Sequence, residues 1–316
     1  MPCRSVDRRI DVDGVGELAV TAYLPESIAG DAVLFLLPGG GYGRHYFDLD
    51  LTGHPDHSQA RWHADRGLVT VTVDHLGVGE STVPERPLDF AQVAAAGDAA
   101  VRTVLDRLRS GTLDPELPAI PGAVPIGAGQ SMGGHIVVWT QAAHSTFAGV
   151  AALGSSFTQT RLALQPGRRH PFRAAPMEEV YAAMGDVDFV ASFHWHEEPP
   201  AFVAADMDPG HPAPWRSATV PACAAELMEP FAVARQAAAV RVPVLLVYGE
   251  QDVTAEPLAD LAVFRSAPDL GLLLVPRSAH MHNFAPTRHL VWARLQSFAA
   301  QVVEQRRLVA GVPARA

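Results

Sequence analysis

The sequence predicts an α/β fold, because strand-like apolar runs alternate along it with helix-like stretches. Residues 32–37 and 68–74 are apolar or β-branched runs of the kind that forms buried strands. Residues 89–109 carry apolar side chains at helical spacing, and another strand-like run follows at 123–128. The chain has 316 residues, 48% of them hydrophobic and 18% charged, which indicates one large globular domain with an insertion.

The remaining elements can be placed in order from local patterns. Residues 6–24 alternate in polarity around a glycine-containing turn, so they predict an opening β-hairpin. Residues 57–66 are helix-like, and Gly67 follows them as a helix-ending residue would. Further strands are expected at 147–154, 242–248 and 270–275, with a closing helix at 287–306.

Residues 129–133 form the most informative motif of the chain, Gly-Gln-Ser-Met-Gly. A strand-like run precedes it and a helix-like run follows it, as in a Gly-x-Ser-x-Gly turn that exposes a reactive serine above a sheet. Small residues two positions before and after the serine let the backbone turn sharply. We therefore expect Ser131 to be a nucleophile; the alternative is a glycine- and serine-rich turn without chemistry.

With these flanks the chain resembles the α/β-hydrolase superfamily over most of its length, apart from a central insertion. The resemblance implies a mostly parallel eight-stranded sheet with helices on both faces and a helical cap inserted after strand 6. It divides the chain into core residues 1–155 and 240–316 and a cap at 156–239. It also implies that the nucleophile, the acid and the histidine occur in that order along the chain.

The segment at 38–43, Pro-Gly-Gly-Gly-Tyr-Gly, is the expected oxyanion loop. Lipases and esterases of the superfamily often carry His-Gly-Gly-Gly there, and proline stands here in place of that histidine. Glycines lack a Cβ, so their amides can approach a substrate oxygen closely. We expect the amide of Gly40 or Gly41 to act with that of Met132; a plain tight turn is the alternative.

The resemblance assigns the acid of the site to the turn at 249–252, which follows an apolar run. Superfamily members commonly use the aspartate of such a Gly-x-x-Asp turn, which is Asp252 in this chain. Glu250 is the second choice, and an ordinary loop carboxylate is the alternative without function.

Two histidines near the C-terminal end compete for the role of base. His280 follows Ala279, and these enzymes usually carry a small residue directly before the base, so His280 is favoured over His282 on motif position. We expect His282 to line the site or to bond to the backbone. His289 falls within the closing helix and is expected at the surface.

The stretch 156–239 is too long for a structureless connection, so we expect a helical cap. Helical pieces are expected near 176–185, 186–195 and 219–238. The stretch is rich in aromatic residues, which suggests an apolar acyl or ring-bearing substrate. The alternative is that these aromatics only pack the cap on the core.

Five side chains are expected to contact the substrate. Tyr42 and His45 follow the glycine loop, and the others are Gln130, His282 and Trp195.

Two groups of histidines raise the question of a metal. They lie between residues 45 and 63 and in the run 194–198, and neither matches a recognised ligand spacing. We therefore expect no metal and no cofactor.

Composition argues against several classes of partner. The net charge of −10 offers no basic stripe for nucleic acid. The two cysteines do not suggest a disulfide framework. The N-terminal residues lack the apolar core of a secretory signal, and no run approaches the roughly 20 apolar residues of a membrane helix. We expect a cytoplasmic protein with a small-molecule substrate and no membrane partner.

These features together predict a serine hydrolase that cleaves a carboxylic ester, lactone or thioester of an apolar small molecule through an acyl-enzyme. The same residues could serve C–C bond hydrolysis, acyl transfer or a lyase reaction, because the fold does not select the chemistry. A binding protein without catalysis is a further alternative. A serine nucleophile argues against the dehalogenases and epoxide hydrolases of the superfamily, which use an aspartate at this position.

Overall fold

The computed structural model describes residues 3–51, 53–162, 187–208, 213–254 and 256–310. Within these ranges one eight-stranded sheet has the spatial order β1-β2-β4-β3-β5-β6-β7-β8. The strands are β1 (Arg4–Val12), β2 (Gly16–Leu24), β3 (Ala32–Leu37), β4 (Val69–Val73), β5 (Val124–Gln130), β6 (Gly149–Leu153), β7 (Val244–Gly249) and β8 (Leu270–Val275). β2 pairs antiparallel with β1 and β4, and every other pair is parallel, so the predicted sheet is confirmed.

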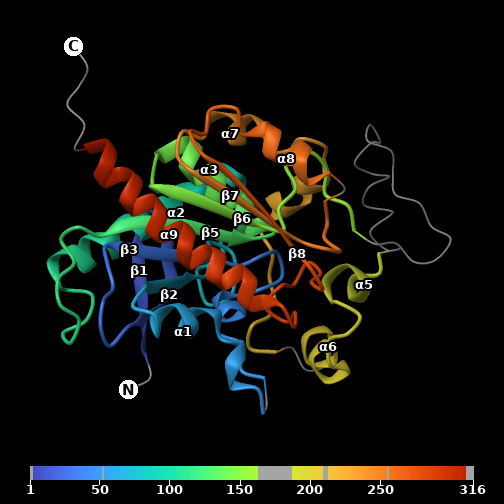
Figure 1. Cartoon of the computed structure of the whole chain (residues 1–316), viewed down its shortest axis with the longest axis horizontal. Coiled ribbons are helices and arrows are strands. Elements are labelled where there is room, and N and C mark those ends of the chain that lie inside the picture. Colours follow the sequence, from blue (N-terminus) through green and yellow to red (C-terminus); the bar gives the residue numbers. More distant parts are fainter. Residues whose placement is uncertain (1–2, 52, 163–186, 209–212, 255, 311–316) are drawn as a thin grey trace.

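Helices cover both faces of this sheet. One layer contains α1 (Gln59–Ala64) and α9 (Arg288–Ala310); the other contains α2 (Phe90–Ser110), α3 (Met132–His144), α7 (Ala234–Ala239) and α8 (Pro257–Val263). Figure 1 shows α9 lying along one face, with its C-terminal end far from α5 and α6. Side chains of a strand alternate between faces, so Leu34 and Leu36 of β3 pack with the first layer and Val33 and Phe35 with the second.

Local signals explain where the helices begin and end. Asp89 caps α2 by accepting the amide of Gln92, whose side chain in turn accepts the amide of Asp89. Gly111, at φ 71°, ends the same helix. The helix expected at 57–66 is a 3₁₀ turn, Pro55–His57, followed by the short helix α1.

The insertion differs in part from the expected helical pieces. It contains α5 (Phe189–Phe193), α6 (Pro200–Met207) and a 3₁₀ helix at Ala222–Met228, whereas the expected piece at 176–185 lies outside the described residues. The helical piece expected near 219–238 is two short helices, this 3₁₀ helix and α7, rather than one continuous helix. Pro230 has no amide hydrogen to continue a helix, and Phe231 adopts a φ of 63°, so the chain turns there before α7 begins.

Two further properties bear on the chemistry. Cys3 and Cys223 are buried free thiols, and burial raises their pKa to about 11 and about 12, so neither is a ready nucleophile. Among the helices of the described ranges, none combines the length and apolar character needed to cross a membrane.

Candidate active site

Ser131 sits on the sharp turn between β5 and α3. Its φ of 53° and ψ of −120° fall in a region that residues other than glycine rarely adopt. A Cβ at Gly129 would lie 2.1 Å from the carbonyl carbon of Gly133, and one at Gly133 would lie 2.1 Å from the carbonyl oxygen of Leu37. The Ser131 amide donates to the carbonyl of Leu153 at 2.7 Å. The turn therefore needs both glycines, and it holds the partly exposed serine at the C-terminal edge of the sheet.

His280 and Asp252 meet beside this turn. Nδ1 of His280 lies 2.8 Å from Oδ1 of Asp252, and both side chains are 3% exposed. The amides of Gly249 and Val253 donate to the same carboxylate at 2.8 and 2.7 Å, which fixes its orientation. A Cβ at Gly154 would lie 2.9 Å from Nδ1 of His280, so a glycine is needed there. This arrangement favours a proton on Nδ1 and a lone pair on Nε2, as a general base requires.

Gln130 is fully buried and contacts the histidine. Its Nε2 lies 3.3 Å from both Nε2 and the carbonyl oxygen of His280. Because that carbonyl can only accept, the amide NH₂ faces His280, and Nε2 of the ring must then be the unprotonated nitrogen. Its Oε1 would lie 2.2 Å from a Cβ at Gly39. We expected Gln130 to contact the substrate, but it lies buried between His280 and Gly39.

The glycine loop turns immediately after β3. Gly41 has a φ of 80°, and the Tyr42 amide donates to the Gly39 carbonyl at 3.2 Å, which closes a turn that requires glycine at its third position. A Cβ at Gly40 would lie 3.8 Å from the sulfur of Met132. A Cβ at Gly41 would have no neighbour within 4 Å.

The competing acid and bases lie apart from the His280–Asp252 pair. Glu250 accepts the backbone amide of Arg277 at 2.9 Å near the surface. His282 is buried, and its ring lies 6.0 Å from that of Tyr46. Burial lowers the pKa of His282 to about 4, so it is neutral near pH 7. The exposed His289 stacks on the Trp62 ring and meets the Trp292 ring edge-on.

The other expected substrate contacts have varied surroundings. Tyr42 is 1% exposed and its hydroxyl donates to Oδ2 of Asp206 at 2.7 Å. Trp195 is 7% exposed and its indole N–H donates to Glu197 at 3.2 Å. His45 lies partly exposed in the 3₁₀ turn Arg44–Phe47.

An apolar cluster next to the histidine was missed from the sequence. Its members are Leu162, Val187 and Val253, with Phe193 and Met228 packed against them. The Phe193 ring lies 5.3 Å from the His280 ring, and its carbonyl accepts the Met281 amide at 2.8 Å. The aromatic-rich composition of the insertion was a signal for such a cluster, but it did not single out Phe193.

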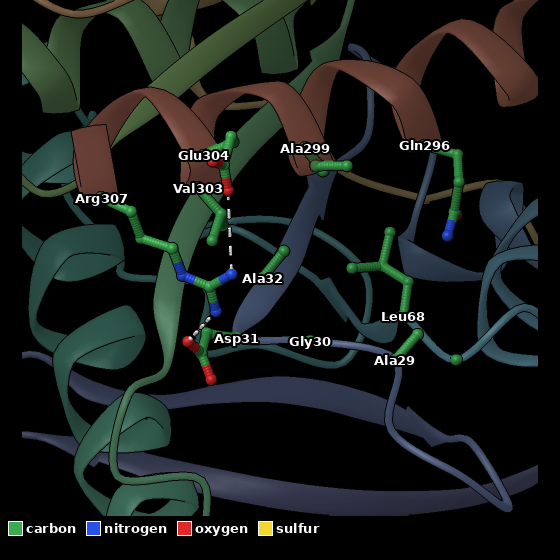
Figure 2. Close-up of a pocket in the computed structure, with 12 residues that line it drawn as sticks. Ala29, Gly30, Asp31, Ala32, Leu68, Gln296, Ala299, Val303, Glu304 and Arg307 are labelled. Carbon is green, nitrogen blue, oxygen red and sulfur yellow. Dashed lines mark hydrogen bonds and ion pairs between the residues drawn. The ribbon is translucent and has the colours of Figure 1, made fainter.

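A cavity of about 350 Å³ lies between α9 and the segments that precede β3 and β4. Figure 2 shows Arg307 reaching toward Asp31 and Glu304 at one end of this cavity. Arg307 lies 2.8 Å from Asp31 and 3.9 Å from Glu304, so these charges pair with one another. Apart from α9, the lining comes from the N-terminal ends of parallel strands, at the edge of the sheet opposite Ser131.

The comparisons with known proteins agree with the fold. The model of the Alpha/beta hydrolase family matches residues 34–290. The proline iminopeptidase of Mycobacterium smegmatis is 17% identical, with 95% of this chain and 100% of that chain covered and a TM-score of 0.63. A thermophilic esterase from Thermogutta terrifontis is also 17% identical, with 94% and 99% covered and a TM-score of 0.56.

A third solved structure, E-2-(acetamidomethylene)succinate hydrolase, is 19% identical, with 93% and 99% covered and a TM-score of 0.55. At these identities the likeness to solved structures establishes the fold alone. No curated protein matches the chain. The family match spans most of the sequence and agrees with the sheet order and the serine turn, and the chain therefore belongs to the Alpha/beta hydrolase family.

Proposed function

We propose that the protein is a serine hydrolase that cleaves a carboxylic ester, thioester or lactone of an apolar small molecule. The observation that carries this proposal is the strained Ser131 turn beside a buried His280–Asp252 pair joined at 2.8 Å. A residue held at a sparsely populated φ and ψ needs surrounding structure to maintain it, and such residues cluster at active sites. The apolar cluster around Phe193 supports an apolar acyl group or ring in the substrate.

The first half of the reaction transfers the acyl group to the serine. Nε2 of His280 takes the hydroxyl proton as the Ser131 oxygen attacks the carbonyl carbon, and Asp252 stabilises the imidazolium without taking its proton. The amides of Gly40 and Met132 donate to the oxyanion, Gly41 being the alternative to Gly40. One such donor typically contributes about 2.7–4 kcal/mol of transition-state stabilisation. The imidazolium then protonates the leaving oxygen or sulfur as its bond to the acyl carbon breaks.

The second half hydrolyses the acyl-enzyme. His280 takes a proton from water as the water oxygen attacks the acyl carbon, and it returns a proton to Ser131 as the acid leaves. In the described structure the Ser131 hydroxyl is not hydrogen-bonded to His280, whose Nε2 faces Gln130 at 3.3 Å. Catalytic hydrogen bonds are often long before substrate binds. We infer that Ser131 turns toward Nε2 in the substrate complex and that Gln130 keeps the ring in place until then.

The test is hydrolysis of p-nitrophenyl esters of rising acyl length by the wild type and by Ser131→Ala. We expect turnover that depends on Ser131, with an acyl-length optimum that reports the size of the apolar pocket. The matched control is Ser297→Ala, a serine on α9 whose hydroxyl, among the described residues, donates only to the carbonyl of Ala293, and it should keep wild-type activity. Turnover that survives in Ser131→Ala would overturn the assignment. So would a wild type that neither turns over these esters nor reacts with a fluorophosphonate.

A further inference from the structure

A chain of buried polar side chains joins the insertion to the glycine loop. We call Glu198, His194, Asp206 and Tyr42 the cap–loop chain. Nδ1 of His194 lies 2.7 Å from Glu198, and its Nε2 lies 3.0 Å from Oδ2 of Asp206. The Tyr42 hydroxyl donates to the same oxygen at 2.7 Å. Tyr42 directly follows Gly41, so the chain ends at the expected oxyanion loop.

The charges of the cap–loop chain are paired inside the protein, with the Arg216 guanidinium as a second cation 3.9 Å from Oδ2 of Asp206. The side chains of His194, Glu198 and Asp206 are at most 1% exposed. Two carboxylates at this depth need a cation, because an unpaired buried charge is costly. Both nitrogens of His194 face carboxylate oxygens, and only the imidazolium donates from both. Burial alone would lower the pKa of His194, but the hydrogen bonds to Asp206 and Glu198 raise it to about 9.

This arrangement bears on the histidine-rich run at 194–198. Each nitrogen of His194 is taken up by a carboxylate, so the ring has no lone pair to offer to an ion. Across the described ranges, no three His, Cys, Asp or Glu side chains converge on a possible metal position.

Further contacts hold the loop against the insertion. The indole N–H of Trp215 donates to Oδ1 of Asp206 at 2.8 Å, and the Arg216 guanidinium lies 4.2 Å from the centre of the Tyr42 ring. The backbone adds an antiparallel bridge between Tyr42 and Arg216. The amide of Ser217 donates to the carbonyl of Gly41 at 2.9 Å.

The contact of Tyr42 with Asp206 matters because the glycine loop has little rigidity of its own. Gly39, Gly40 and Gly41 are consecutive, and glycine has the greatest backbone freedom of any residue. An oxyanion hole works only when its amides are aligned before the reaction. Tyr42 is the first residue after the glycines with a side chain, and that side chain is fixed at Asp206.

We propose that Tyr42, Asp206 and His194 are positioning residues that hold the glycine loop against the cap and so align its oxyanion amide. The inference rests on the proposed serine-hydrolase function. It implies that the oxyanion amide is aligned only when the insertion is packed against the glycine loop. Phe193, next to His194, contacts the His280 ring. The same segment of the insertion therefore contacts the proposed base and also contributes His194 to the cap–loop chain.

The test compares Tyr42→Phe and Asp206→Asn with Tyr23→Phe. The control removes an equivalent bond, because the buried Tyr23 hydroxyl donates to Asp48 at 2.8 Å on the sheet. We would measure kcat and KM for the preferred p-nitrophenyl ester and the inhibition constant of a matching trifluoromethyl ketone. That ketone is attacked by the serine to give an oxyanion, so its affinity reports the alignment of the amides.

We expect kcat to fall about 10- to 100-fold in both loop variants with KM within about 3-fold, since small misplacements near the reacting atoms have effects of this size. The affinity of the ketone should fall by the same factor as kcat/KM, and Tyr23→Phe should stay within about 2-fold of wild type. Asp206→Asn keeps the shape of the side chain and serves if Tyr42→Phe does not fold.

Two results would overturn the inference alone. One is that Tyr42→Phe and Asp206→Asn behave like the control; the other is that they raise KM while kcat and the ketone affinity stay unchanged. A wild type without Ser131-dependent activity or labelling would instead overturn the proposed function. The two failures are therefore distinguishable in one set of measurements.

Discussion

His280 and His194 are both buried histidines bonded to carboxylates, and the difference between them lies in the second nitrogen. Nδ1 of His280 contacts Asp252 at 2.8 Å, while its Nε2 faces the NH₂ group of Gln130. His194 has a carboxylate on each side, Glu198 at 2.7 Å and Asp206 at 3.0 Å. The His280 ring keeps a lone pair that can accept a proton, whereas both N–H groups of the His194 ring donate to carboxylates.

This difference teaches that the partners of a histidine, more than its burial, decide what it can do. One carboxylate orients the ring and stabilises a charge that appears only during the reaction. Two carboxylates keep the ring charged at neutral pH, so it serves as a fixed cation between them, and Arg216 adds a second cation beside Asp206. The same residue type is then a candidate base in the core and a structural cation in the insertion.

The largest expected effect separates the two histidines by rate. His280→Gln should lower kcat by about 10⁴-fold or more, because loss of a base removes the activation of the nucleophile. His194→Gln should act only through the position of the glycine loop, with a fall of no more than about 100-fold. Steady-state kinetics on one p-nitrophenyl ester checks both. Equal losses of kcat in the two variants would contradict the different roles assigned to the two histidines.

The next effect tests the acid. Asp252→Asn should lower kcat by about 10⁴-fold, since an amide in that place favours the wrong tautomer of His280. Glu250→Gln is the matched control in the same turn and its kcat should stay within about 2-fold of wild type. Among the described residues, the side chain of Glu250 bonds only to the Arg277 amide. A larger loss in Glu250→Gln than in Asp252→Asn would transfer the role of the acid to Glu250.

A smaller effect is expected on stability at high pH, where His194 loses its proton. The pKa of His194 is raised from 6.5 to about 9 in the folded protein, so its contribution is complete below pH 6.5 and is lost as the pH rises through 9. The loss corresponds to about 3 kcal/mol of unfolding free energy. The groups that face this ring are Glu198 and Asp206, with Tyr42 and Arg216 acting through Asp206.

Urea unfolding at pH 7 and pH 10 measures this loss. The sequence contains no lysine, but the thiols of the unfolded chain titrate between these pH values while burial raises the pKa of both cysteines in the folded protein, so the cysteines destabilise both proteins alike at pH 10. The difference between the proteins isolates His194: wild type should lose about 3 kcal/mol more than His194→Gln. An equal loss in both proteins would show that His194 is not the charged member of the cap–loop chain.

The sequence predicted the core of the fold because its signals are local. Apolar runs marked the strands, and the glycines at 129 and 133 marked the turn that the structure places between β5 and α3. The order of the serine, acid and histidine along the chain added the expected site. Pro230 was a further local signal, because it separates the two short helices found within the piece expected near 219–238.

The cap–loop chain could not be predicted in the same way, because its members are far apart in the sequence. Tyr42 and Asp206 are 164 positions apart, and no periodic pattern connects them. A single acid in the apolar helix Pro200–Met207 was the available hint that Asp206 has a buried partner. The contact of Gln130 with His280 was not foreseen for a related reason: the motif locates the residue but does not say which way its side chain points.

Covalent labelling of Ser131 tests the central claim most directly. Wild-type protein, Ser131→Ala and His280→Gln would be treated with a fluorophosphonate, digested, and searched by mass spectrometry for the modified peptide. The account predicts one adduct, on Ser131, that is absent from Ser131→Ala and forms far more slowly in His280→Gln. An adduct on another residue, or labelling that persists unchanged in Ser131→Ala, would contradict it.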